Sequence, residues 1–148
     1  MSAQAVGARL ERLYRALAEG AMAGLPICNP ALSVAALGFR EAGGEAVGVV
    51  VTPWFLNVVA APLGTAAPAR PGETRRLALP AGELELIVGE LPGFGRLDAA
   101  SLFSPMFGFA DMDAALAAAE GALEALFAVP PPRAIPRRAF LGGRAAGG

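Results

Sequence analysis

The side chains that most often carry out chemistry in proteins are scarce in this chain. Its 148 residues include no His and one Cys, and its twelve positively charged residues are all Arg. Without imidazole there is no general base suited to neutral pH and no Ser-His or Cys-His nucleophile pair, and without Lys there is no Schiff base. Cys28 alone forms neither a disulfide within the chain nor a four-thiolate metal site. We therefore expect no catalytic residue, no metal site and no cofactor.

Carboxylates are the remaining groups that could act as acid and base. Asp111 and Asp113 lie two positions apart at the start of an expected helix, so their side chains point in different directions. Glu83 and Glu85 share one face of an expected strand, where a solvated face is the ordinary interpretation. Neither pair makes a convincing acid-base couple. The composition favours binding without catalysis, and an enzyme is the less favoured alternative.

Length and charge narrow the class of protein further. A chain of this size is expected to form one domain that buries a core without disulfides. The net charge of −1 and the scattered arginines argue against a nucleic-acid-binding face. The most apolar stretch, 46–62, is short for a membrane-spanning helix and contains Pro53 and Asn57. The N-terminus lacks the apolar run of a secretory signal, so we expect a soluble, cytoplasmic protein that does not span a membrane.

Apolar periodicity predicts a helix near each end of residues 1–129 and strands between the two helices. Apolar residues recur at helical spacing in 5–23 and again in 111–127. The expected strands are 32–39, 47–52, 54–61, 73–79 and 83–88. The predicted fold is α+β, a two-layer sandwich with a mainly antiparallel sheet of about five strands flanked by the N- and C-terminal helices. We expect one domain over 1–129 and a flexible Pro/Arg/Gly-rich tail over 130–148.

Two segments hold more aromatic side chains than a connection needs. In 52–57, a proline divides an apolar run and is followed by Trp54, the only tryptophan. In 101–111, three Phe and one Met occur within seven residues, and Pro105 and Gly108 discourage a continuous helix. Each segment either fills the core or forms a surface that contacts a partner, and the residues alone leave both alternatives open.

These segments also carry a resemblance to a known family. Residues 29–32, 38–40, 48–57, 79–82, 101–107 and 109–111 resemble, in this order, the HybE/HupJ-type assembly chaperones of [NiFe] hydrogenases. The resemblance implies a fold similar to that of secretion-chaperone α+β sandwiches. It also implies a cytoplasmic chaperone that binds an immature hydrogenase subunit before twin-arginine (Tat) export. The favoured partner is the small-subunit precursor with its twin-arginine signal, and the large-subunit precursor and other accessory proteins are further partners. The alternative is a scaffold that bridges maturation proteins without contacting the signal peptide.

The expected partner-binding residues come from the two aromatic segments. The aromatic and Met side chains would supply apolar area, and the Asn and Ser side chains would supply hydrogen bonds. Asp111 would either attract a client arginine or only cap its helix. The full set is Thr52, Pro53, Trp54, Phe55, Asn57, Phe103, Ser104, Pro105, Met106, Phe107, Phe109 and Asp111.

Two positions depart from the family pattern that the resemblance implies. Ala100 stands where a Cys is expected, and Gly108 stands where a Glu is expected between two phenylalanines. This chain therefore cannot perform a redox or iron-handling role that depends on that thiol. The departure favours a function in protein binding over one in metal transfer.

The tail contains the sequence Arg137-Arg138-Ala139-Phe140-Leu141, which matches the core of a twin-arginine export signal. We do not expect it to direct export, because seven residues follow it and they include no apolar segment. A chance basic tail is the simple interpretation. The alternative hypothesis is that the tail mimics the signal of the client and competes with it for the same groove.

Overall fold

The computed structural model describes residues 1–130 of the chain. Two helices enclose the strands in sequence, α1 (Ala3–Glu19) and α2 (Met112–Phe127). The strands are β1 (Ala35–Ala42), β2 (Glu45–Val51), β3 (Leu56–Pro62), β4 (Thr74–Leu79), β5 (Gly82–Ile87), β6 (Glu90–Leu91), β7 (Gly95–Arg96) and β8 (Asp98–Phe103). The predicted tail lies outside the described residues except for Pro130, so its separation from a domain over 1–129 stays a prediction.

Six of the strands form one antiparallel sheet in the order β1-β2-β3-β8-β5-β4, and β6 pairs with β7 in a separate ribbon. Consecutive strands are neighbours from β1 to β3, and β8 returns to pair with β3. The sequence does not predict β8, because its short Ala- and Ser-containing run lacks alternating large apolar residues. This strand matters for the site, because it brings the segment after residue 103 next to the turn between β2 and β3.

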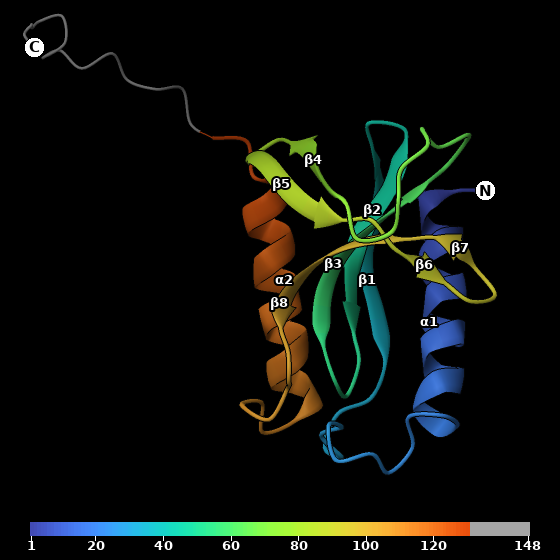
Figure 1. The fold of residues 1–148 in the computed structure, drawn as a ribbon. Coiled ribbons are helices and arrows are strands. Elements are labelled where there is room, and N and C mark those ends of the chain that lie inside the picture. Colours follow the sequence, from blue (N-terminus) through green and yellow to red (C-terminus); the bar gives the residue numbers. More distant parts are fainter. Residues whose placement is uncertain (131–148) are drawn as a thin grey trace, which may run out of the picture.

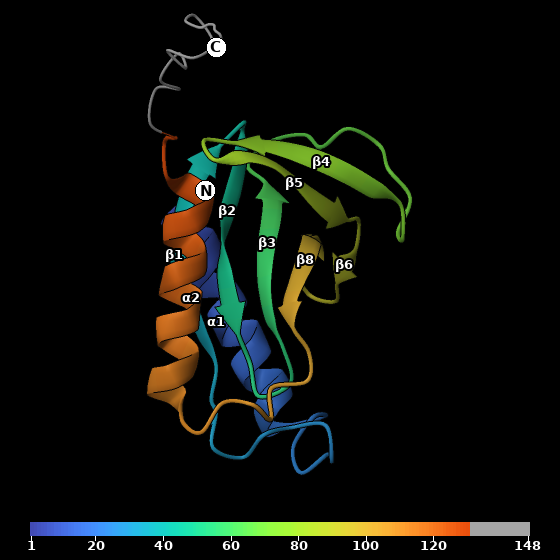
Figure 2. The same ribbon diagram turned by 90° about the vertical axis from the view of Figure 1, so that its left-hand side faces the viewer.

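The two helices cover opposite faces of the sheet (Figures 1 and 2). Between them, β2 and β3 are buried on both faces, as their nearly continuous apolar sequences require. Val49 and Val58 belong to the core under α2, while Val50 and Val59 belong to the core under α1. The α+β class, the mainly antiparallel sheet and the flanking helices are confirmed. The sheet and the two helices form three layers where two were predicted, because each helix packs on its own face of the sheet.

Helix α1 is shorter than the helix predicted over 5–23. The Ser2 side-chain oxygen accepts a hydrogen bond from the Ala5 backbone N–H at 3.1 Å, which caps the start of the helix. Gly7 allows the helix to lie close to the sheet, because a Cβ at this position would come within 2.7 Å of the Phe39 ring. Neither helix in the described part of the chain is long and apolar enough to cross a membrane.

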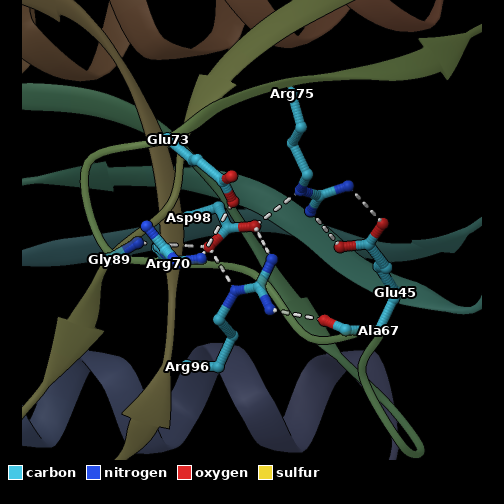
Figure 3. A network of polar contacts seen from close by, with 8 residues as sticks. All are labelled: Glu45, Ala67, Arg70, Glu73, Arg75, Gly89, Arg96 and Asp98. Atoms are coloured by element: carbon cyan, nitrogen blue, oxygen red, sulfur yellow. Dashed lines mark hydrogen bonds and ion pairs between the residues drawn. The ribbon is translucent and has the colours of Figure 1, made fainter.

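A cluster of charges around the buried carboxylate of Asp98 ties the strands together near the turn between β1 and β2 (Figure 3). Asp98 is 1% exposed and accepts hydrogen bonds from Arg75 at 2.6 Å and from Arg96 at 2.7 and 2.9 Å. Arg75 also donates two hydrogen bonds to Glu45, and Arg96 donates one to the Ala67 carbonyl. The two arginines and two carboxylates neutralise one another and join β2, β4, β7, β8 and the connection between β3 and β4.

The protonation of Asp98 depends on this cluster. Burial alone would raise the pKa of the Asp98 carboxyl, because it disfavours the charged form. Hydrogen bonds from Arg96, Arg75 and the Gly89 backbone N–H outweigh burial and hold the pKa below its ordinary value of 3.8. The folded protein therefore stabilises the ionised form of this carboxyl.

Replacing Asp98 tests the contribution of the cluster. Asp98→Asn removes the charge that both arginines share, and we expect it to lower the free energy of unfolding by about 3 kcal/mol in urea denaturation at neutral pH. The pKa of Asp98 is lower in the folded than in the unfolded protein, so its contribution is present above about pH 4 and is lost as the pH falls. The free energies of unfolding of the variant and the wild type should thus converge as the pH is lowered.

Glu83→Gln is the matched control for Asp98→Asn. It breaks an exposed ion pair, in which Arg76 Nη1 and Glu83 Oε1 lie 3.7 Å apart, and it should change stability little. A deficit of Asp98→Asn that stayed constant into strong acid would contradict the role given to the ionised carboxyl.

Candidate partner-binding surface

The two aromatic segments of the sequence meet at one end of the sheet. Residues 52–55 connect β2 to β3, and residues 104–111 connect β8 to α2. Leu56 pairs with Phe103 across β3 and β8, which places the two connections side by side. The connection between α1 and β1 lies at the same end, at the bottom of Figures 1 and 2. Three segments that are far apart in sequence thus form one surface.

Asn29, in the connection between α1 and β1, holds the three segments together. Its backbone N–H donates to the Pro53 carbonyl at 2.9 Å. Its side-chain Nδ2 donates to the Met106 carbonyl at 3.0 Å and to the Phe109 carbonyl at 2.9 Å, while Oδ1 accepts from the Ala31 N–H at 3.0 Å. Asn29 is only 7% exposed, so these bonds are shielded from water. The side chain fixes the position of both aromatic segments relative to the sheet.

Thr52 shapes the turn between β2 and β3 from inside. Its buried Oγ1 accepts hydrogen bonds from the Trp54 N–H at 3.2 Å and the Phe55 N–H at 2.9 Å. Its own backbone N–H donates to the Phe55 carbonyl at 2.8 Å. Pro53 is buried in the same turn and presents its carbonyl to Asn29. Thr52 and Pro53 therefore form the buried frame of the surface.

The aromatic side chains of the turn pack against α1. Tyr14 lies in edge contact with Phe55, with ring centroids 5.4 Å apart, and 6.5 Å from the ring of Trp54. Burial raises the pKa of Tyr14 to about 12. Trp54 and Phe55 remain half-buried, so each offers only part of its ring to a partner.

The segment after β8 alternates between buried and exposed side chains. Met106 is fully buried and fills the core under α2. Phe103 and Phe107 are 45% and 55% exposed, and Phe103 makes an edge contact with half-buried Phe109 at 5.1 Å between centroids. The core and surface explanations of this segment thus apply to different residues within it.

The polar residues of the predicted set differ in their surroundings. Ser104 and Pro105 are both exposed. The Ser104 Oγ lies 3.5 Å from the Trp54 carbonyl oxygen. Asn57 has a buried Oδ1 that finds no donor among residues 1–130. Asp111 caps α2, because its carboxylate accepts a hydrogen bond from the Ala114 N–H at 2.9 Å. Its exposed position also leaves it accessible to a partner.

Large apolar side chains that are exposed to solvent concentrate at this end of the molecule. We call them the apolar end: Leu25, Ile27, Leu102, Phe103 and Phe107, which are 40% to 55% exposed. Only three other large apolar side chains are as exposed in the described chain: Met1, Ile87 and Val129. Such clustering is typical of a surface that another protein covers. The sequence does not single out Leu25 and Ile27, because nothing in their local pattern distinguishes an exposed from a buried residue.

A hollow of about 580 Å³ adjoins the apolar end, between the last turn of α1 and the connection that follows it. The residues that line it include Leu25, Cys28 and Pro53 and two charged residues, Arg15 and Glu19. Asp111 and Asp113 add exposed carboxylates at the start of α2, while Arg15 is paired with Glu11 at 3.3 Å. The hollow itself is lined by one cation and one anion, so the acidic charge of this surface comes from the start of α2.

Cys28 shows no metal-binding surroundings. Its thiol donates to the Met22 carbonyl, with Sγ 3.3 Å from the oxygen. Over residues 1–130, no group of three or more Cys, Asp or Glu side chains is arranged to hold a metal ion.

Comparison with known proteins decides the family. The family model described as "[NiFe]-hydrogenase assembly, chaperone, HybE" matches residues 5–143. The chain belongs to the HybE family. The match covers both aromatic segments, Asn29, and the arginine pair at 137 and 138.

Individual relatives agree with membership of the HybE family. The chain is 52% identical over 124 residues to the hydrogenase expression/formation protein HupJ of Bradyrhizobium diazoefficiens, covering 84% of this chain and 73% of HupJ. It is 43% identical over 143 residues to HupT of Azotobacter chroococcum, covering 94% and 95% of the two chains. The solution structure of HybE from Escherichia coli superimposes with a TM-score of 0.66 at 24% identity over 86% of this chain and 83% of HybE, which confirms the fold.

Substitution of Asn29 tests whether it organises this surface. Asn29→Ala removes two side-chain donors and leaves the Met106 and Phe109 carbonyls without them, so we expect a loss of about 3 kcal/mol in the free energy of unfolding. Asn57→Ala is the matched control, because the Asn57 Oδ1 accepts no hydrogen bond within the described residues, and it should change stability by less than about 1 kcal/mol. Equal losses in urea denaturation would contradict the role of Asn29.

Proposed function

We propose that this HybE-family chain binds an immature hydrogenase subunit at the apolar end, without catalysing a reaction. The subunit is the small-subunit precursor with its twin-arginine signal, bound in the cytoplasm before export. The observation that carries the proposal is the clustering of Phe103, Phe107, Leu102, Leu25 and Ile27 on one end of the fold. Membership of an assembly chaperone family supports a hydrogenase protein as the partner.

The surface is suited to binding because its backbone is already fixed. The Asn29 hydrogen bonds and the Thr52 turn hold the segments that carry the exposed side chains. A partner that binds here does not have to order these segments, so less of the binding free energy is lost to ordering. The apolar side chains, in turn, lose contact with water when a partner covers them.

Charge favours a positively charged partner. Asp111 and Asp113 are exposed at the start of α2, while Glu19 lines the hollow together with Arg15. A twin-arginine signal combines consecutive arginines with apolar residues, and an arginine pairs well with carboxylates beside apolar surface. The proposed contacts of the predicted set are therefore Phe103, Ser104, Pro105, Phe107 and Asp111, with Trp54, Phe55, Asn57 and Phe109 adding partial contacts. Thr52, Pro53 and Met106 support the surface from inside.

Replacing Phe107, which is exposed at the apolar end, should weaken precursor binding more than replacing Ile87, which is equally exposed on β5. We expect Phe107→Ser to weaken binding of the small-subunit precursor at least about tenfold in calorimetry, because it removes a central apolar contact. Ile87→Ser is the matched control, since Ile87 is also 55% exposed but lies on β5. Equal affinities of the two variants would contradict the proposed site. Binding of a precursor that lacks its signal with undiminished affinity would favour the scaffold.

The carboxylates at the start of α2 should contribute through charge. Asp111→Asn with Asp113→Asn keeps a capping side chain at position 111, because Asn caps a helix about as well as Asp. We expect the double variant to bind the precursor about fivefold more weakly at low salt, with a smaller deficit at high salt. Glu83→Gln with Glu85→Gln removes the same charge from β5 and should leave affinity unchanged. Unchanged affinity of the Asp111 and Asp113 variant would show that Asp111 only caps its helix.

A further inference from the structure

We propose that residues 137–141 of the chain's own C-terminal segment bind the apolar end and cover it until a client displaces them. The segment is Arg137-Arg138-Ala139-Phe140-Leu141, which lies outside the described residues. The proposed occupant is part of the same molecule. The effect of this segment on client binding rests on the proposed function, whereas the docking of the segment on the apolar end is independent of it.

The length of the chain after α2 allows this contact. The apolar end lies beside the start of α2, and the described chain ends beyond the other end of that helix (Figure 1). The 16 residues of α2 span about 24 Å at 1.5 Å per residue. From Pro130, the last described residue, the seven residue steps to Arg137 reach at most about 25 Å and the ten steps to Phe140 about 35 Å, at about 3.5 Å per fully extended residue. In an extended chain the arginine pair can therefore come close to Asp113, and Phe140 and Leu141 can reach Phe103 and Phe107.

Charge favours the same path. Residues 131–148 contain four Arg and no acidic residue. Helix α2 contains Asp113, Glu120 and Glu124, all exposed, and no Lys or Arg. Since 113, 120 and 124 are seven and four positions apart, these carboxylates lie along one side of the helix. An arginine-rich segment that returns along α2 meets only negative or neutral side chains of that helix on its way to the apolar end.

The segment also matches the apolar end in chemistry. Phe140 and Leu141 are, with Ile135, the only large apolar residues after 130. Phe140 and Leu141 are separated from the two arginines by Ala139 alone, so a single short stretch offers cations for Asp111 and Asp113 and apolar side chains for Phe103 and Phe107. The stretch lies within the residues that the family model matches. It presents the same combination of groups that we propose for the client.

A segment tethered to its own site competes with a free partner even when it binds weakly. Its effective concentration is on the order of 1 mM, so an intrinsic Kd of about 0.1 mM would raise the apparent Kd of a client about tenfold. Such a contact keeps the apolar side chains away from water and from unspecific partners, and a client with a full signal still displaces it.

Amide NMR spectra of the full chain test the docking without any client. We expect Phe140→Ser to shift the resonances of residues 25–28 and 102–110, because their neighbour is lost. Ile135→Ser, the control in the same segment, should shift only resonances near position 135. Changes confined to the C-terminal segment in both variants would overturn the proposal. Docking shifts that vanish on dilution would also overturn it, since they would show that the segment of a second copy is bound.

Affinity for a synthetic small-subunit signal peptide tests the competition. The full-length Phe140→Ser variant should bind the peptide about tenfold more tightly than the wild type and the Ile135→Ser control. Equal affinities would overturn the covering role. Docking shifts in the NMR spectra together with no peptide binding by any variant would contradict the proposed function while supporting the internal contact.

Discussion

The surface at the end of this fold depends on the hydrogen bonds of one buried amide. Asn29 joins the connection after α1 to the turn between β2 and β3 through Pro53, and to the connection before α2 through Met106 and Phe109. A neutral amide suits this position, because it satisfies several backbone groups in a buried place without the cost of burying a charge. The exposed side chains of Phe103 and Phe107 rest on the segments that it fixes.

The two ends of the sheet are held by different chemistry. Near the turn between β1 and β2, Arg75 and Arg96 share the buried carboxylate of Asp98, and Glu45 completes the cluster. This cluster is internally neutral and already paired, so it joins strands and leaves no free charge for a ligand. At the other end, the buried polar groups are those of Asn29 and Thr52 and the Oδ1 of Asn57, while several apolar side chains face solvent. That contrast supports placing the function at the apolar end.

The sequence predicts the elements whose residues follow a clear apolar pattern and misses those whose residues do not. The alternation of charge and leucine in 83–88 predicts β5, and the valine-rich runs predict β2 and β3. The run that forms β8 contains two alanines and a serine, and pairing with β3 imposes its strand conformation more than its own residues do. The aromatic segments are recognisable as unusual, but sequence does not separate buried Met106 from exposed Phe107, one position further. The contacts of Asn29 span more than 70 positions and follow only from the topology.

Hydrogen exchange of the full chain with and without the small-subunit precursor tests most directly whether the apolar end is where the client binds. We expect exchange to slow in residues 25–28 and 102–110 when the precursor is bound, because the partner covers their exposed side chains. Exchange in β4 and β5 should stay the same. Protection that falls on β4 and β5 and spares residues 102–110 would show that the precursor binds elsewhere than at the apolar end.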